Sequence, residues 1–313
     1  MSRHTKALLA LIYICIIWGT TYLSIRIVVQ HFPPFLFAAI RQIISGIIII
    51  VIALAINRKA DLTMKNILHQ ALIGFLLITM GNGFVSWGEK FIPSGVAALI
   101  CSLMPLNAVL MNVAINKEKV NLHIMTGLVI GFLGIALIFR DNIADLGNSA
   151  YLWGMIATFF ASSCWSLGSV LNKKHVSPTN PIFNSGLQLC FGSIGLLAIS
   201  FVMDDYSHLD FFQPAVVGNM AYLVIFGSVL AYTLYMYALK ELPMGISSLY
   251  AYVNPLVAVL IGYWILNEQL TWYTAASLMT IATGVYIVNY GYRKQHKQTA
   301  EEQAALLTIP EAE

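Results

Sequence analysis

Residues 89–105, with the sequence EKFIPSGVAALICSLMP, decide how this chain is organised, because a related stretch, KELPMGISSLYAYVNP, recurs at residues 240–255. Each copy predicts a Pro-Gly turn that opens an apolar helix carrying a further proline. Such a helix frees a backbone carbonyl, which in lipid has to face a bundle interior or a cavity. We therefore expect an internal duplication with four prolines as structural hinges, namely Pro93, Pro105, Pro243 and Pro255.

The composition predicts an integral membrane protein. Of the 313 residues, 58% are hydrophobic and only 10% are charged, whereas soluble domains are about 25% charged. The four cysteines lie in apolar segments without the spacing of metal ligands, so neither a metal site nor a disulfide framework is expected. The expected fold class is all-α.

Ten apolar windows are long enough to cross about 30 Å of hydrocarbon as helices. We predict a first repeat at residues 1–143, a second at residues 144–292, and a disordered cytoplasmic tail at residues 293–313. The expected spans are residues 7–29, 36–56, 67–87, 94–115, 123–140, 150–171, 183–203, 217–239, 245–266 and 273–290.

The loop charges predict the orientation. Of the 17 Lys and Arg residues, 13 fall at the termini and in alternate loops, and two fall in the other set of loops. Basic loops stay in the cytoplasm, so both termini are expected there, in a multi-pass protein of the inner membrane. Five spans per repeat is an odd number, so the second repeat enters the membrane from the opposite side. Inverted repeats of this kind enclose a midplane site that opens to each side in turn.

Several motifs, taken in their order and spacing, carry a family resemblance. The first half contains WGTTYLSI at 18–25, FAAIRQ at 37–42, SGVAALICSLMP at 94–105 and GLVIGFLGIALI at 127–138. The second contains SCWSLGSV at 163–170, the long motif ending at Pro255, and Glu268. Residues 7–290 thereby resemble the ten-helix drug/metabolite transporter superfamily and, within it, the EamA-type exporters. The resemblance implies export of a small metabolite through a central cavity formed by both halves.

Arg41 is the candidate residue whose charge is most costly to place within the bilayer. It lies about 10 Å into the second span by helical rise, where a charge needs a partner. Three interpretations remain open: it binds a substrate carboxylate, it pairs with Glu89, or it is a structural arginine at the membrane interface.

Aromatic and polar stripes at helical spacing supply the other candidates. Trp18, Tyr22 and Arg26 follow one another on one face of the first span, and polar residues do the same in the third, sixth, eighth and ninth spans. Such stripes either line a cavity or join neighbouring helices. The expected substrate-binding residues are Trp18, Tyr22, Arg41, Asn82, Trp165, Tyr232, Tyr250 and Asn254.

Missing motifs narrow the function. The chain has no nucleotide-binding P-loop, HExxH motif or credible catalytic triad, so we expect neither an enzyme nor a cofactor. We predict a secondary-active or facilitative exporter of amino acids or similar amphipathic metabolites. The alternatives are efflux of drugs or toxic compounds, and a membrane assembly protein that transports nothing. The expected partners are a small-molecule substrate, the lipid bilayer and protons as the candidate coupling ion, with no nucleic acid, in a monomer or weak homodimer.

Overall fold

The computed structural model describes residues 2–56, 62–116, 121–141, 148–174, 180–207, 209, 211–242, 247 and 250–307. Every element in this part of the chain is helical. The order is α1 (Arg3–Val29), α2 (Pro34–Ile56), α3 (Met64–Gly74), η1 (Phe75–Asn82), α4 (Gly83–Gly88), α5 (Ser94–Cys101), α6 (Met104–Asn116), α7 (Leu122–Asp141), α8 (Ser149–Lys174), α9 (Pro181–Met203), α10 (Pro214–Tyr222), η3 (Leu223–Leu230), α11 (Ala231–Glu241), α13 (Tyr250–Leu266) and α14 (Trp272–Leu307).

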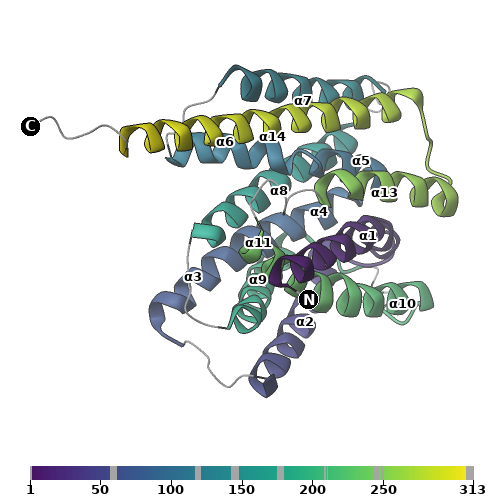
Figure 1. Cartoon of the computed structure of the whole chain (residues 1–313). Helices are drawn as coiled ribbons and strands as arrows, with labels where there is room; N and C mark the ends of the chain where they lie inside the picture. The colour runs from purple at the N-terminus through teal and green to yellow at the C-terminus, as the bar shows by residue number, and fades with distance from the viewer. Residues whose placement is uncertain are drawn as a thin grey trace, which may run out of the picture.

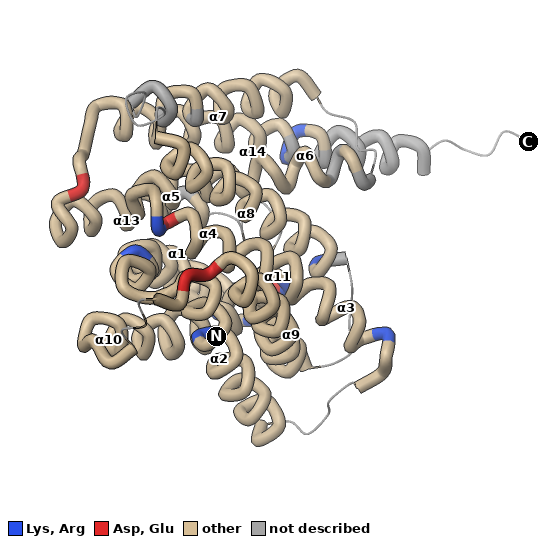
Figure 2. Tube along the Cα trace, turned by 180° about the vertical axis from the view of Figure 1, so that it is seen from behind, with Lys and Arg blue, Asp and Glu red and all other residues tan. Residues whose placement is uncertain are grey.

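The helices confirm an all-α membrane protein. Among the described residues, seven helices or runs of consecutive helices are long and apolar enough to cross a bilayer, and Leu122–Gly134 and Val253–Leu266 are shorter apolar helices. Figure 2 shows long uncharged stretches of chain, with most of the charged residues near helix ends. Each expected span coincides with a helix or with consecutive helices wherever its residues are described.

Three expected spans are not single regular helices. The third is α3, η1 and α4 in sequence, and the eighth is α10, η3 and α11. Both η1 and η3 are π-helical, a wider turn that is rare and often found at functional sites. The fourth span breaks at Ser102, whose N–H donates to the Ala98 and Leu99 carbonyls at 3.0 and 3.2 Å.

The predicted hinge prolines occupy different positions. Pro93 precedes α5 as its N-cap, Pro105 is the second residue of α6, and Pro255 lies inside α13. Pro243 lies outside the described residues. A proline is tolerated in the first turn of a helix, where its missing N–H has no helical partner. In the fourth span, therefore, the helix ends just before Pro105 and a new one begins.

The last helix continues beyond its expected end. We expected disorder from residue 293, whereas α14 extends to Leu307. This stretch is rich in Ala, Gln, Glu and Leu, whose intrinsic propensity favours a helix.

The helices are arranged in layers, with α1 in the middle one. Figure 1 shows α7 and α14 side by side in one layer, with α2 and α9 on the opposite side of the molecule. Between them, α1 contacts α11 and α13. We call the end where α1 begins the terminal end; there the Tyr237 hydroxyl donates to the Arg3 carbonyl at 3.3 Å. At the opposite end, the distal end, Gln30 Nε2 donates to the Lys90 carbonyl at 3.4 Å.

Carboxylates from the second predicted half cap helices of the first at the distal end. Asp204 accepts from the Phe35 and Leu36 N–H groups at 3.3 and 2.7 Å. Glu268 accepts from the Ser94 N–H at 2.9 Å and the Gly95 N–H at 3.2 Å. A negative charge is favourable at a helix N-terminus, so these contacts join the two halves.

Candidate functional site

A central cavity lies where the two predicted halves meet. All eight residues that we expected to bind substrate line it, and they come from α1, α2, η1, α8, α11 and α13. The structure thus brings together Trp18, Tyr22, Arg41, Asn82, Trp165, Tyr232, Tyr250 and Asn254. Arg26, from the same stripe as Trp18, does not line the cavity; its Nη1 donates to the Glu89 carbonyl instead.

Four aromatic rings from four helices close one side of the cavity; we call Trp18, Trp165, Tyr235 and Tyr250 the aromatic cluster. The Trp18 ring lies 5.6 Å from Trp165, 5.1 Å from Tyr235 and 5.0 Å from Tyr250 between centroids. The Trp18 indole N–H donates to the Gly227 carbonyl at 3.0 Å. Edge-to-face pairs at these distances are favourable, so the rings stabilise one another as a unit.

The aromatic cluster separates the cavity from a smaller pocket. That pocket shares Trp165 and Tyr250 with the cavity but is also lined by Leu239 and Ser247. Leu239 lies at the terminal end, because it follows by two residues Tyr237, whose hydroxyl bonds Arg3 there. In this conformation the cluster therefore stands between the cavity and the terminal end.

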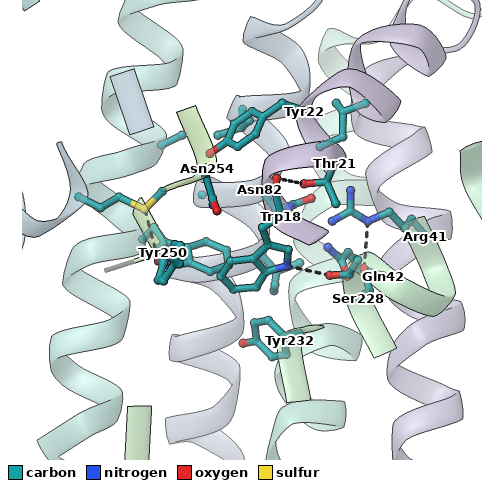
Figure 3. A pocket seen from close by; sticks show the side chains of 18 residues that line it. Trp18, Thr21, Tyr22, Arg41, Gln42, Asn82, Ser228, Tyr232, Tyr250 and Asn254 are labelled. Carbon is teal, nitrogen blue, oxygen red and sulfur yellow. Dashed lines mark hydrogen bonds between the residues drawn. The ribbon is translucent and has the colours of Figure 1, made fainter. Parts of the chain in front are cut away.

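Unpartnered polar atoms distinguish the opposite wall of the cavity. Arg41 is only 4% exposed, and its Nε donates to Ser228 Oγ at 3.1 Å. Among the described residues, Arg41 Nη1, Gln42 Oε1 and Asn82 Oδ1 have no hydrogen-bond partner. Figure 3 shows Arg41, Gln42 and Ser228 on one side of the Trp18 indole and Tyr250 on the other. Buried polar atoms are costly when unpaired, so this wall is suited to receive a polar ligand.

The contacts of Arg41 disfavour two of its three interpretations, the ion pair with Glu89 and the arginine at the membrane interface. We considered an ion pair with Glu89, but the guanidinium Nε donates to Ser228 Oγ, and the Glu89 carboxyl oxygens have no hydrogen-bond partner among the described residues. Arg41 also lines the cavity instead of reaching the membrane interface. A substrate carboxylate is the interpretation that its free nitrogen supports.

The Tyr232 hydroxyl bonds a side-chain amide, whereas the Asn254 amide bonds backbone carbonyls. The Tyr232 hydroxyl donates to Gln188 Oε1 at 2.6 Å, and Gln188 Nε2 donates to Gln70 Oε1 at 2.6 Å. A chain of buried amides thus holds Tyr232, whose ring lines the cavity. When its amide nitrogen is placed as donor, Asn254 bonds the carbonyls of Tyr250 at 2.9 Å and Cys15 at 3.0 Å, which leaves its oxygen as an acceptor.

Sequence reasoning missed Gln42 as a site residue. It follows Arg41 directly and lines the same cavity, at 2% exposure. A second polar side chain next to a charge inside an apolar run was the available signal, since neither is stable against lipid. Thr21 and Met104, which also line the cavity, carry no comparable signal.

A family model for the EamA-like transporter family matches residues 5–140 and again residues 152–290. The chain belongs to the EamA-like transporter family. It is therefore a multi-pass membrane transporter and not an enzyme. The double match covers most of the chain and falls on both predicted repeats.

Individual EamA-like relatives agree with this assignment. The uncharacterized inner membrane transporter YedA of Escherichia coli (strain K12) is 32% identical over 286 residues, which are 90% of each chain. The uncharacterized transporter YoaV of Bacillus subtilis (strain 168) is 24% identical, over 93% of this chain and 99% of that protein. One crystal structure matches with a TM-score of 0.67 at 18% identity, over 92% of this chain and 98% of that chain, which supports the fold alone.

Proposed function

We propose that this protein exports small amphipathic metabolites, amino acids above all, by alternating access through the central cavity. The observation that carries the proposal is a set of three polar atoms without a hydrogen-bond partner among the described residues, Arg41 Nη1, Gln42 Oε1 and Asn82 Oδ1, in a cavity that is also lined by aromatic and apolar side chains. They provide one cationic donor and two neutral acceptors.

This set matches the two charged groups of an amino acid. A guanidinium is a strong donor to a carboxylate, and amide oxygens accept from an ammonium group, which carries three donors. The ring faces of Trp18 and Tyr250 offer an apolar surface to the side chain and attract a cation. A zwitterion would satisfy all three atoms and bring no net charge into the membrane.

Efflux of lipophilic cationic drugs is the alternative that Arg41 disfavours. Its guanidinium is almost fully buried and has no carboxylate partner among the described residues. A second positive charge in the cavity would be repelled, because electrostatic interactions are strong where water is excluded.

The loop charges set the proposed direction. With both termini in the cytoplasm, the terminal end faces the cytoplasm and the distal end faces outward. The aromatic cluster would then close the cavity from the cytoplasm in the conformation described here. Substrate would enter when these four rings separate, and it would leave through the distal end.

Transport by the purified protein in proteoliposomes tests the proposal. We expect exchange of labelled for unlabelled amino acids, with weaker competition by amino acid methyl esters, which lack the carboxylate, and by N-acetyl amino acids, which lack the ammonium. Arg41→Gln should raise the apparent KM at least tenfold, about 1.4 kcal/mol, whereas Lys6→Gln, which removes an exposed charge on α1, should have no effect. Stronger competition by lipophilic cations than by amino acids would refute the proposed substrate class.

A further inference from the structure

The structure contains a buried acid that the proposed substrate site does not use. Glu89 is the first residue after the span Met64–Gly88, and its side chain is 0% exposed. Among the described residues, neither of its carboxyl oxygens has a hydrogen-bond partner. An ionised carboxylate is costly in such surroundings, so the neutral acid is favoured in this conformation.

Glu89 lies on the face of its helix that continues the cavity wall. Asn82 and Val85 line the cavity, and Glu89 follows Val85 by four residues and Asn82 by seven, which places it on the same face and nearer the distal end. On α1, Arg26 is likewise one turn beyond the cavity residue Tyr22, and it donates to the Glu89 carbonyl. Glu89 and Arg26 together therefore cover the distal end of the cavity.

A separate pocket lies on the outer side of this cover. It is lined by Arg26, Gln30, His31, Pro93 and Glu268. Arg26 thus belongs both to this distal pocket and to the contact with Glu89. If α1 moved away from Glu89 at the distal end, the carboxyl would be exposed to the distal pocket. If the helices moved apart between Glu89 and the cavity residues Tyr22 and Val85, the carboxyl would be exposed to the cavity.

The charged and titratable groups around Glu89 come from every neighbouring element. They are Tyr22 and Arg26 of α1, Arg41 of α2, Cys101 of α5 and Glu268 after α13. Tyr151, in the first turn of α8, lies at the same end of the molecule as Glu89. Burial raises the pKa of the Glu89 carboxyl well above its ordinary value, while the charge of Arg26 opposes this shift.

We propose that Glu89 is the proton-binding site through which this exporter is coupled to protons. This inference rests on the proposed function, because it assigns the coupling ion for the same cavity. The carboxylate takes up one proton from the distal side, is covered as the neutral acid, and releases that proton when the cavity opens to the terminal end. One proton then moves inward for each substrate molecule that moves outward.

Proteoliposomes with a trapped pH-sensitive dye test the coupling. At zero membrane potential, one proton per substrate predicts a substrate gradient of about tenfold per pH unit in the wild type. Glu89→Gln keeps the size of the side chain but binds no proton, so it should still exchange labelled for unlabelled substrate, while substrate-dependent proton movement and accumulation are lost. Glu241→Gln, at the terminal end of α11, should behave as the wild type. Three outcomes would overturn the proposal. Glu89→Gln could still move protons, it could lose exchange although it is folded, or the wild type could respond to a sodium gradient in place of a pH gradient.

A titration with protons alone separates this inference from the proposed function. Infrared difference spectra of the purified protein between low and high pH should show a carbonyl band of a buried carboxylic acid. The band should be absent in Glu89→Gln and present in Glu241→Gln. If the wild type moves no amino acid but the band follows Glu89, only the substrate class fails. If the band persists in Glu89→Gln, the proton site is wrong.

Discussion

At the scale of single residues, Trp18 belongs both to the cavity lining and to the aromatic cluster. Its ring packs against three members of the aromatic cluster at 5.0–5.6 Å, and its N–H is bound to the Gly227 carbonyl of η3. The same side chain is therefore a wall of the cavity and part of the barrier toward the terminal end. Its removal should affect substrate binding as well as stability.

Replacing Trp18 tests this double role. Trp18→Ala should lower thermal stability, since truncating a well-packed Trp costs about 3–5 kcal/mol, and it should raise the apparent KM of amino acid exchange at least tenfold. Trp18→Phe retains a ring and should be intermediate in both measurements. Trp153→Ala is the matched control, because Trp153 is 59% exposed and faces away from the cavity. An unchanged KM for Trp18→Ala would contradict its place in the substrate site.

Much of the cavity lining could be predicted from the sequence at this scale. A large polar side chain within a span has no partner in hydrocarbon, so Asn82 was expected to face inward, and the polar and aromatic stripes at helical spacing placed Trp18 and Tyr250 on the same inner faces. The hydrogen-bond partners could not be predicted, because they depend on how distant segments meet. Arg41 pairs with Ser228 of the opposite half, 187 residues away along the chain, and Tyr232 pairs with Gln188 of the preceding span, 44 residues away.

At the scale of helices, the two π-helical segments set the shape of the cavity. They lie in the third span of each predicted half, and both contribute to its lining: Asn82 from η1, and Gly227 and Ser228 from η3. A π-turn changes the direction of the side chains that follow it. The position of these spans could be predicted from their length and apolar composition, but the wider turns could not, because the same apolar pattern suits a regular α-helix.

Close glycine contacts between α7 and α14 hold the outer layer together. Gly127 and Gly131 of α7 face Gly284 of α14, and the two helices pack along their length. A Cβ added at Gly284 would lie 2.4 Å from the Gly131 nitrogen and 2.7 Å from the Gly127 oxygen. These are backbone atoms, so the two helices could relieve the clash only by moving apart.

Substitution of these glycines should destabilise the protein without touching the cavity. Gly284→Ala is expected to cost about 1–3 kcal/mol of stability through overpacking, seen as a lower midpoint of thermal unfolding in detergent. Gly218→Ala in α10 is the control, since nothing lies within 4 Å of the added Cβ, and it should be neutral or gain about 0.5–1 kcal/mol from helix propensity. Equal stability of the two variants would show that α7 and α14 tolerate separation.

At the scale of the whole molecule, the contacts between the halves are concentrated in layers. Asp204 and Glu268 join them at the distal end, the aromatic cluster joins them on the terminal side of the cavity, and the central cavity lies between. Alternating access requires that these layers open one at a time. Glu89 and Arg26 belong to the distal layer. Under the proposed coupling, protonation of Glu89 would bear on that layer and, through Arg41, on the cavity.

The most direct test of this account is the accessibility of one cavity position from the two sides of the membrane. In a chain without its native cysteines, Asn82→Cys would be treated with an impermeant thiol reagent in oriented vesicles, with Lys6→Cys and His31→Cys marking the terminal and distal ends. We expect the cysteine at position 82 to react from either side, more slowly when a transported amino acid is present, while each of the other two reacts from one side only. Reaction at position 82 from a single side, with and without substrate and at every pH, would contradict alternating access through this cavity.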